Sequence, residues 1–173
     1  MLKHIFIAIL LYVGLGTAVA ETLTSNTMSS SAGMTVADAD EHEIRFVINN
    51  DEVYDKRLNL TWQRCSVGQK WVENSGCIGP IKRVNFEQAQ KLANGEWRIP
   101  TKDELVTLID KRYHNPAIRV DLFPDMDVTY LVYWTSNETN PLCAAAVFFG
   151  HGFAFTCIGR TALAYVRLVR NGP

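Results

Sequence analysis

The sequence predicts an α+β domain, and three observations carry this prediction. Two short stretches in which apolar and polar residues alternate come first, over 44–48 and 58–63. Two amphipathic segments with helix-capping residues follow between 85 and 112. The C-terminal part is rich in aromatic and β-branched residues in segments of strand length. Strands, then helices, then strands again are typical of an α+β fold.

The two N-terminal strands are predicted from this alternation. The sequence Asn-Asn-Asp at 49–51 ends the strand over 44–48, because these residues favour turns. The strand over 58–63 alternates leucine and tryptophan with polar residues. The segment 65–80 is rich in glycine, serine and asparagine, and we expect it to form a loop.

The two helices are predicted from their N-terminal caps. Asn85 can accept a hydrogen bond from the first turn, which predicts a helix over 86–93. Thr101 and Glu104 have the spacing of a capping box, which predicts a second helix over 102–112. The second helix would end before an Asn-Pro pair, since proline cannot continue a helix.

The C-terminal part is expected to be mostly strands. A polar loop is predicted over 121–129, and a Gly-His-Gly turn lies at 150–152. The strands predicted in this half cover 130–136, 144–149, 153–158 and 164–170.

The first 43 residues predict export. A lysine precedes an apolar run and then an Ala-Val-Ala cleavage site, so 1–20 is expected to be a signal peptide. The alternative is a membrane anchor, but the apolar run is short of the ~20 residues that a span needs. The serine- and threonine-rich segment 21–43 is expected to be a disordered linker. The folded domain would then be 44–173, exported to the periplasm, the cell surface or the medium, with no stable membrane span after cleavage.

Four cysteines lie in the exported part, and an even number in an oxidising compartment predicts two disulfides. Three pairings are possible, and we favour the two local ones, Cys65–Cys77 and Cys143–Cys157. The close spacing of cysteines typical of zinc sites is absent from the sequence.

Composition and motifs narrow the function. The chain has 47% hydrophobic and 20% charged residues and a formal net charge of −1, whereas a dedicated nucleic-acid-binding protein would be basic. His114 and His151 stand alone, without a serine or cysteine motif that would make either a catalytic base. We therefore expect no nucleic-acid partner, no catalytic residues and no cofactor.

Five motifs in order resemble a known family. Together they are similar to the Lcl C-terminal domain, which ends a bacterial collagen-like adhesin and has long been filed as a domain of unknown function. The motifs are Leu60–Cys65, Trp97–Leu105, Phe123-Pro124, Tyr133–Ser136 and Val166–Arg170.

This resemblance implies a fold related to C-type lectins and formylglycine-generating enzymes, with two helices, short antiparallel strands, and paired first and last strands. It also implies binding of sulfated polysaccharides, which is reported for the founding adhesin as a trimer. The present chain has no collagen-like Gly-X-Y tract to form a trimeric stalk.

Candidate ligand-binding residues are of two kinds. Clustered cations can contact sulfate or phosphate through charge-assisted hydrogen bonds, and an exposed aromatic ring can stack on a sugar. The candidates are Lys82, Arg83, Lys111, Arg112, Arg119, Tyr133 and Trp134. The motif residues expected to serve the fold are Trp62, Trp97, Arg98, Pro100, Thr101 and Glu104. The alternatives are scattered surface charge for the cations and a core position for Trp134.

Asp121, Asp125 and Asp127 are spaced closely enough to suggest a calcium site, because carboxylate oxygens suit that ion. The spacing of an EF-hand and the motifs of calcium-dependent lectins are absent. We therefore expect a solvated acidic loop and no metal.

These observations leave three hypotheses for function. The first is an exported, noncatalytic recognition module for polysaccharide or another surface polymer. The second is a structural or assembly component of the bacterial envelope with a protein partner, which an exposed apolar patch would favour. The third is an enzyme related to formylglycine generation, which a free thiol pair in a cleft would favour.

Overall fold

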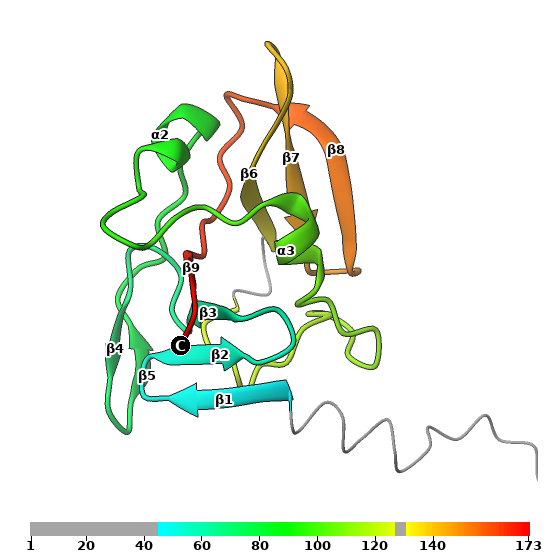
Figure 1. Cartoon of the computed structure of the whole chain (residues 1–173). Helices are drawn as coiled ribbons and strands as arrows, with labels where there is room; N and C mark the ends of the chain where they lie inside the picture. Colours follow the sequence, from blue (N-terminus) through cyan, green and yellow to red (C-terminus); the bar gives the residue numbers. More distant parts are fainter. Residues whose placement is uncertain (1–44, 127–130) are drawn as a thin grey trace, which may run out of the picture. The chain divides into compact units, whose positions relative to one another are not determined.

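The computed structural model describes residues 45–126 and 131–173. Within these residues, small antiparallel sheets and two short helices make up the regular structure (Figure 1), so the α+β prediction is confirmed. Outside the described residues lie the predicted signal peptide over 1–20, the predicted linker over 21–43, and Ile44, Asp127 and Tyr130.

Four antiparallel strands form one sheet, in the order β1, β2, β3, β9. On its inner face the register places Val53 beside Trp62 and Trp62 beside Val169, and all three side chains are fully buried. The strands are β1 Phe46–Asn49, β2 Glu52–Asp55, β3 Leu60–Gln63 and β9 Val169–Asn171.

Strand β2 was missed by the sequence pattern because one of its inward positions carries a charge. Asp55 is fully buried and accepts hydrogen bonds from Arg45, including one of 3.0 Å from Nε. A carboxylate at a core position hides the alternation of apolar residues that predicts a strand.

The expectation that the first and last strands pair is wrong. Strand β9 pairs with β3, and β1 lies at the opposite edge of the same sheet. Strand β2 of the β1–β2 hairpin pairs with one edge of β3 (Figure 1). The other edge of β3 is therefore the one that pairs with the C-terminal strand β9.

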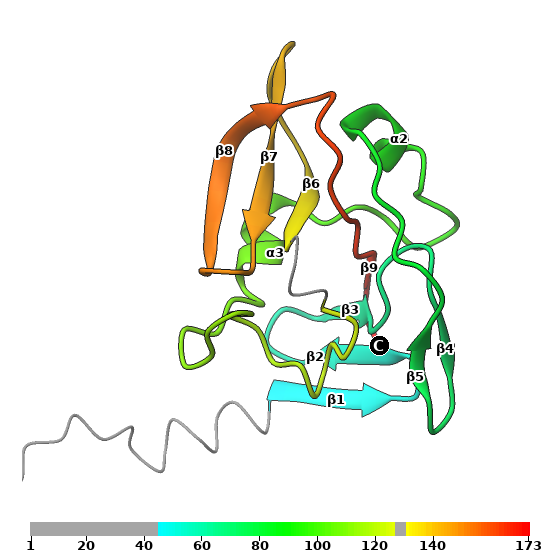
Figure 2. The ribbon, with the colours of Figure 1, turned by 180° about the vertical axis from the view of Figure 1, so that it is seen from behind.

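The predicted loop over 65–80 contains a further hairpin, formed by β4 Lys70–Val72 and β5 Gly76–Ile78. The Cys65–Cys77 disulfide ties this hairpin to the end of β3, as predicted. The strands were not recognised because they are short and their turn is polar. Figure 1 and Figure 2 both place the hairpin beside the β1–β2 turn.

The two helices have the predicted capping boxes. Asn85 caps α2 Phe86–Gln90, and Thr101 caps α3 Lys102–Val106. Helix α3 is shorter than the predicted 102–112. After Val106 the backbone bonds tighten, since the N–H groups of 107, 108 and 109 each donate to the carbonyl three residues back.

A three-stranded antiparallel sheet forms the rest of the domain, in the order β6, β7, β8. The Cys143–Cys157 disulfide links β7 to β8, as predicted. The strands are β6 Val132–Asn140, β7 Cys143–Phe148 and β8 Phe153–Gly159. The strand predicted over 164–170 is regular only at its end, in β9; before it, Ala164 and Tyr165 form single bridges to Val84 and Tyr133.

Two buried clusters form the core. One lies between the four-stranded sheet, α3 and the three-stranded sheet, and includes Trp62. The other joins α2 to the three-stranded sheet and the segment before β9, and includes Trp134. The indole N–H of Trp134 donates to the carbonyl of Val84 at 2.9 Å, so that buried donor is paired.

Candidate functional site

The central family motif holds the fold together. The Arg98 guanidinium forms two hydrogen bonds to the Glu104 carboxylate, of 2.8 and 2.7 Å, and a third to Asn171 at 2.9 Å. The Thr101 N–H also donates to Glu104, at 2.8 Å. These bonds join the cap of α3 to the last strand.

The electrostatics of Glu104 fit this role. Burial acts to raise the pKa of its carboxyl, but the hydrogen bonds from Arg98 and Thr101 outweigh it and hold the pKa below its usual value. A pocket of about 390 Å³ lies beside the pair and is lined by both residues. Because their charges already satisfy each other, the pair is a poor contact for a charged ligand.

The two candidate aromatic residues do not offer stacking surfaces. Tyr133 and Trp134 are both 0% exposed. The Tyr133 hydroxyl forms a hydrogen bond of 2.9 Å with the Ser66 hydroxyl, and burial raises the pKa of Tyr133. The prediction that either ring is open to a ligand is therefore wrong, because both belong to the core. Trp97 is half-buried, with the Arg170 guanidinium 5.4 Å from its ring centroid.

The candidate cations do not form one patch. Arg112 pairs with Asp110 and Arg119 pairs with Asp121, at 2.6 and 2.5 Å. The Arg119 guanidinium holds the pKa of Asp121 below its usual value through a hydrogen bond. The segment with Lys82 and Arg83, between β5 and α2, lies on the side of the β4–β5 hairpin, whereas the segment with Lys111, Arg112 and Arg119 follows α3 on the other side (Figures 1 and 2).

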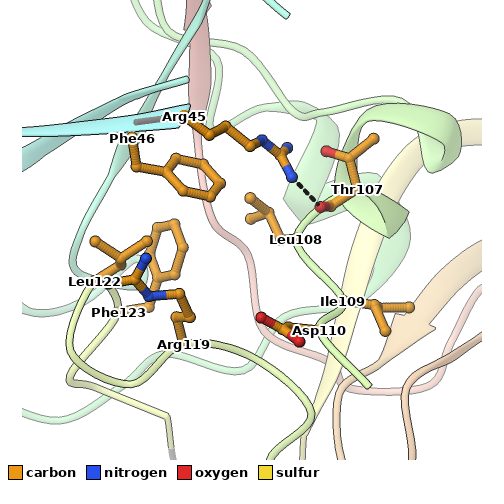
Figure 3. A pocket seen from close by; sticks show the side chains of 9 residues that line it. All are labelled: Arg45, Phe46, Thr107, Leu108, Ile109, Asp110, Arg119, Leu122 and Phe123. Carbon is orange, nitrogen blue, oxygen red and sulfur yellow. Dashed lines mark hydrogen bonds between the residues drawn. The ribbon is translucent and has the colours of Figure 1, made fainter. Parts of the chain in front are cut away.

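A small cavity near Arg119 is structural. Figure 3 shows Arg45 reaching across it to donate to the Thr107 carbonyl, at 3.1 Å. The cavity measures about 20 Å³, room for about one water molecule, so it is too small for an organic ligand.

The expectation of a solvated acidic loop is wrong for Asp125 but not for Asp121, whose side chain is 54% exposed. Asp125 is fully buried and forms an ion pair of 2.5 Å with Arg167, which is also fully buried. Asp121 pairs with Arg119, and Asp127 lies outside the described residues. Among residues 45–126 and 131–173, no group of three or more potential ligands is placed to hold a metal ion.

A cleft beside the β4–β5 hairpin has the volume of a ligand site. It measures about 420 Å³, within the range of small-molecule sites. Its walls are Asp51, Gln63 and the segment 65–71. We call it the Trp71 cleft, because the half-buried ring of Trp71 is its largest aromatic surface.

The walls of the Trp71 cleft are fixed by local contacts. Gly68 has a φ of 105°, and a Cβ there would lie 2.6 Å from the Pro80 carbonyl, so the chain can pass only as glycine. The Gln69 side chain donates to the Gly79 carbonyl at 3.0 Å, and the Lys82 N–H donates to Val67 at 2.8 Å. With the Cys65–Cys77 disulfide, these bonds preorganise the cleft.

The buried ion pair between Asp125 and Arg167 holds part of the cleft wall in place. Ser66 lines the cleft, and its N–H donates to the Asp125 carboxylate. Arg167 donates to the carbonyls of Gln63 and Arg64, both at 2.6 Å, and so ties the end of β3 to the same network. The position of Ser66 in the cleft wall therefore depends on the buried ion pair between Asp125 and Arg167.

Sequence reasoning missed Trp71. Of the four tryptophans, it is the one that belongs to none of the five family motifs. It also lies inside a polar, disulfide-closed segment, where no core was expected. A tryptophan in such a segment was the signal that could have pointed to this site.

Comparisons with known proteins give a family. The model of the Lcl C-terminal domain matches residues 51–170, more than half of the chain. No curated protein and no solved structure matches. In the part of the chain that the structure describes, no helix is long and apolar enough to cross a membrane. The chain belongs to the Lcl C-terminal domain family.

Proposed function

We propose that this chain is an exported, noncatalytic recognition module that binds polysaccharide or another surface polymer in the Trp71 cleft. The carrying observation is a preorganised cleft of about 420 Å³ with a half-buried tryptophan in its wall. Tryptophan provides a large, rigid apolar surface against which the C–H face of a sugar ring can pack.

Export is supported by the two disulfides, since such bonds persist in oxidising compartments. A relation to C-type lectins and formylglycine-generating enzymes remains part of the proposal. It is supported by family membership and by the return of the C-terminal strand to the N-terminal sheet. All four cysteines are disulfide-bonded, so the free thiol pair that would favour an enzyme is not found among the described residues.

The test is a binding screen of the purified mature domain against glycans and envelope polymers. We expect Trp71→Ala to weaken binding about tenfold, the loss expected for one stacked ring. The matched control is Tyr113→Ala, because Tyr113 is an exposed ring (39%) that does not line the cleft. Equal losses in both variants would place the binding elsewhere, and binding of no polymer would refute the proposal.

A protein partner in the envelope is the second candidate. The observation that favours it is apolar exposure on the outer face of the same hairpin, where Val72 is 45% and Ile78 is 51% exposed. Replacement of Ile78 by aspartate would then abolish copurification with an envelope protein while leaving polymer binding intact. Copurification that survives this change would count against the outer face as the contact.

A further inference from the structure

We infer that the Trp71 cleft selects uncharged sugar units, whose hydroxyl groups bond Asp51 and Gln63, and rejects sulfated or phosphorylated ones. This inference rests on the proposed function and names its ligand class. Two observations support it: the contacts of the cations near the cleft, and the polar side chains in its wall that have no partner in the part of the protein that the structure describes.

The cation closest to the Trp71 ring is already committed. The Arg64 guanidinium lies 4.1 Å from the ring centroid. Its three nitrogens donate to the carbonyls of Leu122, Asn50 and Asp121, at 2.9, 2.9 and 3.0 Å. A sulfate or phosphate binds best through a bidentate contact with free N–H groups, but every nitrogen of Arg64 already donates to a loop carbonyl, and only the second N–H of each terminal nitrogen is left.

Lys70 contributes to the cleft but directs its side chain elsewhere. Successive residues of a strand point to opposite faces, and Lys70 precedes Trp71 in β4. The register places Lys70 opposite Ile78 and Trp71 opposite Cys77. The Lys70 side chain therefore belongs to the outer face of the hairpin, with Val72 and Ile78, while Trp71 shares its face with the disulfide.

The polar side chains that remain suit hydroxyl groups. Neither the Asp51 carboxylate nor the Gln63 amide has a hydrogen-bond or ion-pair partner among residues 45–126 and 131–173, and both line the cleft. A sugar hydroxyl can donate to Asp51 and can both accept from and donate to Gln63. A sulfate cannot donate to either group, and the negative charge of Asp51 repels it.

Most other charged side chains are already paired. The arginines at 45, 98, 112, 119, 160, 167 and 170 all form ion pairs with carboxylates. Asp51 is thus unusual as a carboxylate that lines a cleft of ligand size without a cation of its own. This contrast is the reason to assign it to the ligand.

The experiment measures retention of the mature domain by immobilised polymers at low and at high salt. The uncharged probes are dextran, laminarin, galactomannan and chitin hexasaccharide, and the charged probe is heparin. We expect at least one uncharged probe to bind equally well at about 1 M salt, where the Debye length falls to about 3 Å. Heparin should bind more weakly than that probe at every salt concentration.

Three variants sharpen the test. Trp71→Ala should lower the affinity for the uncharged probe about tenfold, and Trp71→Phe should restore much of it, because a ring remains. Asp51→Asn should lower the affinity for the uncharged probe about fivefold, because a charge-assisted acceptor is lost. The same change should raise the affinity for heparin, because the negative charge that repels it is gone. The control is Asp103→Asn, since the Asp103 side chain is 91% exposed and lies outside the cleft.

The outcomes separate the inference from the proposed function. Heparin binding that requires Trp71 and is lost in high salt would overturn the inference but keep the cleft as the polymer site. Heparin binding that depends on Lys111 and Arg112, which do not line the cleft, would overturn the inference and the placement of the site. Binding of no probe, charged or uncharged, would overturn both the inference and the proposed function.

Discussion

The buried ion pair beneath the Trp71 cleft should be a main determinant of stability. In the native domain, Arg167 and Asp125 have fully buried side chains and are joined at 2.5 Å. The change Arg167→Met replaces the cation with an apolar side chain of similar length, and the ring of Phe123 lies beside this position. Asp125 is then left as a buried carboxylate with the Ser66 N–H as its remaining partner.

The expected loss is about 3–5 kcal/mol, the usual result of removing one partner of a buried pair. The bonds from Arg167 to the carbonyls of Gln63 and Arg64 are lost as well, which favours the upper part of this range. Such a loss is a large fraction of the roughly 5–15 kcal/mol that stabilises an ordinary domain. By contrast, Arg119→Met breaks a pair whose carboxylate is 54% exposed and should cost about 1 kcal/mol or less.

Urea unfolding of the two variants and the native domain measures these losses. The double variant with Arg167→Met and Asp125→Leu should recover most of the stability, because it removes the stranded charge. If Arg167→Met lost no more than Arg119→Met, the argument from burial would be refuted. If the double variant failed to recover, the loss would lie in the carbonyl contacts of Arg167 rather than in the charge.

Two further predictions concern the cap of α3. Thr101→Ala should lower the unfolding free energy by about 1 kcal/mol, through loss of the bond to the Glu104 N–H, and an unchanged urea midpoint would mean that the cap is not needed. Glu104 has a lowered pKa in the folded domain, so it stabilises the fold above its ordinary value of about 4.3, and this contribution is lost as pH falls through the folded value. Glu104→Gln should therefore flatten the fall in stability on acidification below about pH 4.3, and an unaltered profile would contradict the assignment.

Local features of the fold could be predicted from the sequence. The caps at Asn85 and Thr101 involve residues three positions apart, so spacing alone carries the information. The disulfide pairing was local too, with separations of 12 and 14 residues. Short loops close at low entropic cost, which is why neighbouring cysteines were the better choice.

Features that depend on distant partners could not be predicted. The pattern of β2 is hidden by Asp55, and no motif of the sequence links that carboxylate to its partner Arg45. The burial of Trp134 depends on the Val84 carbonyl, which lies on a different segment. The order of residues in the sequence also does not reveal that the Tyr133 hydroxyl forms a hydrogen bond with Ser66, which lines the cleft.

The candidate site was missed for a related reason. Its walls come from a turn, a strand end and a loop, at 51, 63 and 65–71, and none of these carries a catalytic or binding motif. Arg98 and Glu104, the charged residues of the central family motif, bind each other. In this chain the motifs mark the scaffold, and the ligand site that we propose lies in the segment between them.

The most direct test of the proposed site is an NMR titration of the mature domain with the uncharged probe that binds most tightly. The four tryptophan indole N–H signals serve as reporters. The account predicts that the Trp71 signal shifts on binding while the signals of Trp62 and Trp134, both 0% exposed, stay in place. A Trp71 signal that does not move at a saturating probe concentration would contradict it.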